Sequence, residues 1–395
     1  MRPAMILLIV TNLTYIMSQP LLVKGARQLL TLRDTASSPA GPRRGAKLSD
    51  LGIIEDGAVL ISNGTIQSVG PTRRLANLAQ TRAIRIIDAT GKVVMPGFID
   101  SDCRLLPSDP SLWKKSSVAK KSLEVSRRKI SQVTACGTLA MESQAGPMAD
   151  YAGELRQLEA NRQLSVSNPN LISTYVPERV YDAQLPKLLK KELFQFIEIP
   201  SSATEFNKEE TRSWMEHAAG LGCLMKIRTS AMSSCRNLPV QQVCWEGDAS
   251  VEEIDWAANQ SWVLLGMPLE SLLQDHSGKQ WREMVDAGVA LALATGANCG
   301  LGGAASMQLV VSLACAQMGL SIEEAITATT INAAHAMGIQ EVTGSLEPGK
   351  RADLLILDVP DYREIPYHLG INLVSKVILH GEILFQQLEP QWLGE

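Results

Sequence analysis

The sequence lacks the features that mark several classes of protein. Its 395 residues contain no run of 18 apolar residues, so no segment is expected to cross a bilayer as a helix. A formal net charge of −4 gives no positive field that would attract nucleic acid. With 45% hydrophobic and 20% charged residues, the composition is that of a globular protein and excludes disorder as the main state. We therefore expect a soluble, folded protein that binds neither nucleic acid nor membrane.

Cysteine is present without paired spacing, and histidine is scarce. The seven cysteines are an odd number and no two of them have Cys-x-x-Cys spacing, which predicts neither a disulfide framework nor a zinc ribbon. We therefore expect a reducing, cytoplasmic location. We expect each of the five histidines to be structural or at the surface; they are His217, His276, His335, His368 and His380.

Residues 1–20 form an extra segment ahead of the predicted domains. Ala4 to Val10 is apolar and follows Arg2, as in a weak signal peptide, but no Ala-x-Ala cleavage site follows. Met17 stands just before the first predicted strand. We therefore predict that the start codon is assigned too early, and we rank secretion below this interpretation.

Both ends of the remaining chain carry β-strand patterns. The predicted strands cover residues 21–32, 57–70, 84–94, 352–357 and 374–385. Ser62-Asn63-Gly64 between two apolar runs is a hairpin signal. Because these strands need partners to bury both faces, we predict that residues 21–95 and 346–395 form one composite β-sandwich.

The intervening residues 96–345 alternate helix and strand patterns. Helical patterns with polar faces cover residues 111–135, 148–163, 204–219 and 304–319. Short apolar runs cover residues 138–141, 171–176, 194–199, 223–227, 262–265 and 289–294. Repeated β-α units over this length predict a (β/α)8 barrel, which places the chain in the α/β class. The chemistry of such a barrel lies at the carboxyl ends of its strands.

The stretch from Lys92 to Leu106 is predicted to contain the first barrel strand. Its run Pro-Gly-Phe-Ile-Asp, from Pro96 to Asp100, resembles the amidohydrolase superfamily, whose first strand reads Pro-Gly-Phe-Ile-Asp-x-His-x-His. In that superfamily the two histidines hold a catalytic divalent metal. Here Asp102 and Arg104 stand at the two histidine positions. Arginine is cationic at any working pH and cannot ligate a metal.

The last hundred residues resemble one family within this superfamily. Matching runs cover residues 297–300, 307–318, 327–334 and 343–354. The run from Asp361 to Leu373 is more specific, and the set resembles imidazolonepropionase over about residues 21–387. This resemblance implies a metal-dependent hydrolase that opens imidazolone-propionate during histidine breakdown.

The resemblance also implies further metal ligands, and each of their positions has changed. Arg228 and Glu253 stand where histidines are expected after strands five and six, and Gly296 stands where an aspartate is expected after strand eight. A catalytic metal needs histidines and a carboxylate that converge on it. We therefore assign no catalytic residue, no metal ligand and no cofactor. The positions of the former site are Asp102, Arg104, Arg228, Glu253 and Gly296.

The candidate ligand-binding residues near the barrel mouth are Arg104, Arg228, Asn298 and Gly300. We predict that the two arginines replace the charge of the metal, each within salt-bridge reach of Asp102 or Glu253. The alternative is an open anion site, in which the arginines have no acidic partner.

Three other kinds of site rank lower. A metal site rebuilt from Asp102, Glu253 and two cysteines would need Cys103 in the lumen, whereas strand alternation points it away if Asp102 faces inward. A nucleophilic cysteine lacks a neighbouring histidine, and the glycine-rich residues 300–303 lack the lysine of a phosphate loop.

We interpret the chain as an imidazolonepropionase-like pseudoenzyme that has lost metal-dependent hydrolysis of C–N bonds. Two alternatives stay open. The first is a residual or rewired hydrolase that acts on the non-peptide C–N bonds of a cyclic amide or imidazolone. The second is a regulatory or structural subunit, and the resemblance implies a homodimer or a heterodimer with an intact paralogue.

Overall fold

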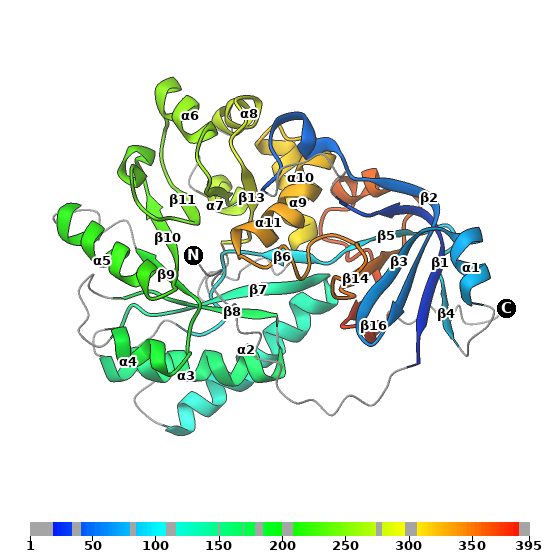
Figure 1. Ribbon diagram of the computed structural model, residues 1–395, viewed down its shortest axis with the longest axis horizontal. Coiled ribbons are helices and arrows are strands. Elements are labelled where there is room, and N and C mark those ends of the chain that lie inside the picture. The colour runs from blue at the N-terminus through cyan, green and yellow to red at the C-terminus, as the bar shows by residue number, and fades with distance from the viewer. Residues whose placement is uncertain are drawn as a thin grey trace.

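The computed structural model describes most of the chain as two adjoining parts, a barrel and a sheet (Figure 1). The described residues are 19–33, 41–79, 84–107, 116–148, 151–168, 170–177, 185–199, 208–273, 279–296 and 306–386. Residues 1–18 and the candidates Asn298 and Gly300 lie outside them. Within the described part of the chain, no helix is long and apolar enough to span a membrane.

The sheet joins both ends of the chain, as the sequence predicts. Its strands are β1 (Leu21–Leu30), β2 (Ile53–Ser62), β3 (Thr65–Pro71), β4 (Arg85–Asp88), β5 (Val93–Pro96), β14 (Leu354–Leu357), β15 (Val374–Leu379) and β16 (Glu382–Gln386). They form one continuous sheet in the order β16-β15-β14-β5-β1-β2-β3, with β4 also paired to β1. The predicted hairpin is present between β2 and β3, where Asn63 and Gly64 have φ of 51° and 72°. Both angles suit the primed turn that such a hairpin needs.

The barrel consists of parallel strands that follow the order of the chain. They are β6 (Phe98–Asp100), β7 (Thr138–Ala145), β8 (Leu171–Tyr175), β9 (Phe196–Ile199), β10 (Leu224–Thr229), β11 (Gln242–Trp245), β12 (Val263–Gly266) and β13 (Leu291–Leu293). The eight strands form a single sheet from β6 to β13 that curls into a nearly closed barrel. The predicted α/β barrel with a composite terminal domain is therefore confirmed.

Helices follow most of the barrel strands, and α1 packs against the terminal sheet. They are α1 (Thr72–Ala79), α2 (Ser116–Ala135), α3 (Tyr151–Ser167), α4 (Leu185–Lys190), α5 (Lys208–Gly220), α6 (Val251–Ala258), α7 (Pro268–Leu273), α8 (Lys279–Asp286), α9 (Met307–Gln317), α10 (Ile322–Ala328) and α11 (Ile331–Ala336). Short 3-10 helices lie at η1 (Gly45–Ser49), η4 (Met232–Cys235) and η5 (Tyr362–Tyr367). Helices α2, α3, α5 and α9 correspond to the four predicted helical segments.

Strands β5 and β14 connect the two hydrophobic cores. Because side chains alternate along a strand, Val93 and Met95 of β5 pack in the barrel core while Val94 packs in the core of the terminal sheet. In β14, Leu355 faces the barrel and Ile356 faces the sheet in the same way. The two strands pair with each other in antiparallel register. This arrangement fixes the barrel on the sheet that both termini build.

Candidate functional site

Three carboxylates converge inside the barrel, near the carboxyl ends of its strands. Asp102 follows β6, Glu142 lies on β7 and Glu198 lies on β9. Each residue is at most 4% exposed. One oxygen from each carboxylate lies within 4.8 Å of the others, a spacing at which the three could share one cation.

The ammonium of Lys226 lies among these carboxylates. Its Nζ is 2.8 Å from Asp102 Oδ2, 2.8 Å from Glu142 Oε2 and 3.1 Å from Glu198 Oε2. Lys226 is on β10 and its side chain is completely buried. The flanking Met225 and Ile227 point the other way, into the core between strands and helices. A buried ammonium needs such acceptors, because an unpaired charge in the interior is strongly destabilising.

The guanidinium of Arg228, two residues further along β10, binds three carboxylates. Nη2 donates to Asp102 Oδ2 at 2.7 Å, Nε donates to Glu198 Oε1 at 2.9 Å and Nη1 donates to Glu246 Oε1 at 2.8 Å. The side chain of Arg228 is 18% exposed. Three of its five N–H groups thus bind carboxylates of the protein itself, so the guanidinium is not the partner-free group that an open anion site requires.

Neutral groups complete the hydrogen bonding of the carboxylates. Gln144 Nε2 donates to Glu198 Oε2 at 3.0 Å, and Thr174 Oγ1 donates to Glu142 Oε1 at 2.5 Å. Cys244 Sγ donates to Asp102 Oδ2 at 3.1 Å. These bonds hold each carboxylate in place independently of the lysine.

The pKa values of the cluster follow from burial and from the shared cations. Burial raises the pKa of Asp102 and of Glu198, but Arg228 and Lys226 outweigh it and hold both below their usual range. Burial and the two neighbouring carboxylates raise the pKa of Glu142 to about 7, although Lys226 opposes this. Burial lowers the pKa of Lys226, and the carboxylates reverse the effect and raise it well above its usual value. Lys226 therefore stays protonated and cannot act as an amine nucleophile.

Buried cysteines near the cluster are not poised for catalysis. Cys103 Sγ donates to the carbonyl of Glu142 at 2.8 Å, and burial raises its pKa and that of Cys244 well above the usual value. A nucleophilic cysteine needs a lowered pKa.

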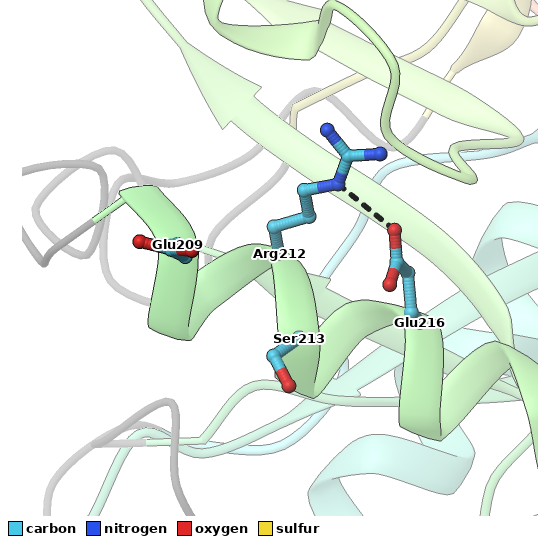
Figure 2. Close-up of a pocket in the computed structure, with 4 residues that line it drawn as sticks. All are labelled: Glu209, Arg212, Ser213 and Glu216. Atoms are coloured by element: carbon cyan, nitrogen blue, oxygen red, sulfur yellow. Dashed lines mark hydrogen bonds and ion pairs between the residues drawn. The ribbon is translucent and has the colours of Figure 1, made fainter.

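A separate surface pocket lies along helix α5. Its lining residues are Glu209, Arg212, Ser213 and Glu216, and its volume is about 530 Å³. Figure 2 shows Arg212 bound to Glu216 one turn away, at 2.9 Å. Both side chains are about half exposed, at 49% and 54%. This is an ordinary solvent-facing pair at i and i+4, so we assign no function to the pocket.

Comparison with known proteins agrees with the fold and identifies the family. An imidazolonepropionase of Geobacillus kaustophilus is 32% identical over 418 residues, which cover 93% of this chain and 98% of the relative. The chain belongs to the imidazolonepropionase family. A second imidazolonepropionase, from Brevibacillus brevis, is 29% identical over 93% of this chain and 98% of the relative. The Amidohydrolase family model matches residues 252–384.

Solved structures of distantly similar proteins share the fold. Guanine deaminase of E. coli superimposes with a TM-score of 0.70 at 14% identity, over 94% of this chain and 100% of that chain. Ochratoxinase of A. niger has a TM-score of 0.69 at 15% identity, over 92% and 95% of the two chains. At these identities the likeness concerns the fold alone.

The site positions expected in an imidazolonepropionase are only partly brought together. The predicted ion pair between Arg228 and Asp102 is confirmed. Arg104 instead donates to the carbonyl of Gly146 and to Gln144 Oε1, which lies 3.4 Å away.

Gly296 has a backbone role beside the cluster. Its N–H donates to the carbonyl of Asp102 at 3.0 Å, and its φ is +61°, in the left-handed region that favours glycine. A Cβ here would lie 3.1 Å from Met267 Sδ. The position where the family resemblance implies an aspartate therefore disfavours any side chain.

The predicted position of Glu253 is wrong. Glu253 lies in the first turn of α6, where it forms a capping box with Ser250 and accepts from the N–H of Ser233 at 3.1 Å. It is half-buried, and the carboxylates that bind Arg228 are instead those of Asp102, Glu198 and Glu246. The carboxylate that takes this place is Glu246, just after β11.

Replacing Glu253 with alanine should lower the free energy of unfolding by about 1 kcal/mol, because only a helix cap and one exposed hydrogen bond from Ser233 are lost. Urea denaturation measures the change, with Glu252→Ala on the same exposed turn as the matched control. A loss of about 3–5 kcal/mol, typical of a broken buried ion pair, would instead place Glu253 in the barrel cluster.

The site does not fit the resident metal that this family implies. Ligand oxygens bind a divalent ion at about 2.0–2.6 Å, so an ion shared by Asp102, Glu142 and Glu198 would overlap Lys226 Nζ. The guanidinium of Arg228 also holds one oxygen of Asp102 and one of Glu198. Two positive charges of the chain itself fill the space where a metal would need to bind.

Proposed function

We propose that this protein is a non-hydrolytic member of the imidazolonepropionase family, a pseudoenzyme that does not activate water on a metal. The observation that carries the proposal is the ion cluster in the barrel. Arg228, at a position where the family resemblance implies a metal ligand, is bound to Asp102 and Glu198, and Lys226 fills the space between three carboxylates. The guanidinium repels a divalent cation and occupies the oxygens of Asp102 and Glu198 that such a cation would need.

Purified protein should hold far less than one equivalent of zinc or iron and should not open imidazolone-propionate. Elemental analysis and a turnover assay with added zinc or ferrous ion test this, with the Geobacillus kaustophilus relative as the active control. Turnover above the protein-free rate, or stoichiometric metal that is lost in Asp102→Asn, contradicts the proposal and favours a rewired hydrolase.

A second proposal is that the protein acts as a subunit. The observation that favours it is a run of large apolar side chains at the end of η5 and just after it, where Tyr367, Leu369 and Ile371 are 82%, 63% and 59% exposed. Asn372 anchors the end of this segment by donating to the carbonyl of Ala135 at 2.9 Å.

We propose self-association as a homodimer through this segment. Light scattering should give twice the mass of one chain; a single-chain mass that doubles only with an intact paralogue would favour the heterodimer.

We also propose a cytoplasmic location. The six cysteines in the described residues are all free thiols, as in a reducing compartment.

A further inference from the structure

Basic residues gather on one side of the barrel, over helices α2, α3 and α4. Eight exposed lysines and arginines lie on these helices and directly after α4, against three exposed acidic residues. The eight form what we call the basic side, and they are Lys120, Lys121, Arg127, Arg128, Arg162, Lys187, Lys190 and Lys191. The three acidic residues are Glu124, Glu159 and Glu192. This local excess of positive charge contrasts with the net charge of −4 of the whole chain.

The three helices are neighbours in space. They follow the consecutive strands β6, β7 and β8, which lie side by side in the barrel. Arg162 of α3 donates to the carbonyl of Lys191 at 3.3 Å, and Lys191 Nζ is 3.7 Å from a carboxylate oxygen of Glu159. Figure 1 shows α2, α3 and α4 together on one side of the barrel and α6 and α8 on the other. Because α2 alone has 20 residues and extends about 30 Å, the basic side is a broad surface.

The side of the barrel that holds α6 has the opposite charge. This helix carries Glu252, Glu253 and Asp255 and no basic residue. A molecule with this distribution of charge turns its basic side toward an anionic surface and its acidic side away from it. Our expectation that the chain binds no membrane used its net charge and its lack of a long apolar run. Neither property describes how charge is distributed over the surface.

We propose that the basic side docks the protein on an anionic lipid surface, with the headgroups of acidic phospholipids as its ligands. Clusters of about four to eight lysines and arginines bind such surfaces, and each residue close to the headgroups strengthens binding about fivefold. Val125 of α2 and Val166 of α3 are each 62% exposed, and they add apolar surface that suits the boundary between headgroups and acyl chains. The inference goes beyond the proposed function and uses no residue of the barrel cluster.

Cosedimentation of the full chain with vesicles tests this inference. Wild-type protein should bind vesicles of phosphatidylserine and phosphatidylcholine but not vesicles of phosphatidylcholine alone. Raising NaCl from about 0.1 M to about 1 M should release it, because the Debye length falls from about 10 Å to about 3 Å. Failure to bind the mixed vesicles at about 0.1 M NaCl, or equal binding to both kinds of vesicle, overturns the inference.

A charge-neutralising variant locates the contact. Arg127→Gln combined with Arg128→Gln removes two exposed charges of α2 and should weaken binding to the mixed vesicles about 30-fold. The matched control is Arg27→Gln combined with Arg73→Gln, which removes the same charge from exposed positions on β1 and α1. The control should bind like wild type. Equal losses for the two variants would show that overall charge, rather than the basic side, attracts the protein, and would overturn the inference.

A second variant and a second polyanion complete the test. Lys120→Gln combined with Lys121→Gln should weaken vesicle binding by a similar factor, so the test does not depend on the stability of the arginine variant. Double-stranded DNA is the competing ligand, because its phosphates carry the same charge as the headgroups. Tighter binding of DNA than of the mixed vesicles at the same salt concentration would assign the basic side to nucleic acid and overturn the inference.

Discussion

Replacing Arg228 with leucine should lower the free energy of unfolding by about 3–5 kcal/mol, the range typical of a broken buried ion pair. The side chain of Arg228 is only 18% exposed and binds Asp102 and Glu198, which are almost completely buried. Without the guanidinium these carboxylates keep only Lys226 as a cationic partner. Urea denaturation monitored by circular dichroism measures the loss.

Two further variants separate charge from packing. Arg228→Leu combined with Glu198→Gln should cost less than Arg228→Leu alone, because one uncompensated carboxylate is removed. Arg212→Leu is the surface control: Arg212 pairs with Glu216, both side chains are about half exposed, and such pairs contribute about 0–1 kcal/mol. Equal losses for the two arginines, or strictly additive effects of Arg228 and Glu198, would show that the cluster is not charge-coupled.

The fold could be predicted because its signals are local and repeated. Apolar runs bounded by turns predicted the barrel strands except β11, for which no run was predicted, and the Asn63-Gly64 pair predicted the hairpin between β2 and β3. The pairing of β5 with β14 was predicted only as an inference that strands at both ends needed partners. The register of this pairing could not be predicted from the sequence. Nothing local in either strand specifies which residues of so distant a strand will lie opposite it.

Part of the site was missed for a physical reason. Lys226, Glu142 and Glu198 are charged residues within buried strands, and each looks like a local exception to the apolar pattern. A charge on a buried strand requires an opposite charge nearby, which was a usable signal. Which strands face one another in the lumen, however, depends on how the barrel curls.

Glu253 was misplaced because the family pattern was given more weight than a local sequence signal. Ser250 followed three residues later by Glu253 is the sequence of a capping box, and the helix begins there as the motif predicts. The strand ends at Trp245, so the next residue, Glu246, is the one that reaches Arg228. The capping motif alone would have placed Glu253 in the first turn of a helix.

Ending the chain after Leu373 should abolish cooperative folding of the N-terminal strands as well. This removes β15, whose Val374, Val377 and Ile378 are completely buried. Burial of three such side chains contributes about 5–9 kcal/mol, which is comparable to the whole stability of about 5–15 kcal/mol for a typical domain. Val377 packs in the barrel core and Ile378 in the sheet core, so both cores lose support.

A longer truncated variant provides the control for this prediction. Ending the chain after Leu379 keeps β15 and removes β16, whose residues Glu382–Gln386 are exposed or half-buried. Both variants lack residues 380–395 and differ only in the residues of β15. A difference between their stabilities therefore reports on β15 alone. We expect the longer one to retain a cooperative urea transition and near-native far-UV circular dichroism, and the shorter one to lose both. If the shorter variant unfolds cooperatively at the urea concentration of the full chain, the strands of the N-terminal segment are stable without their C-terminal partners.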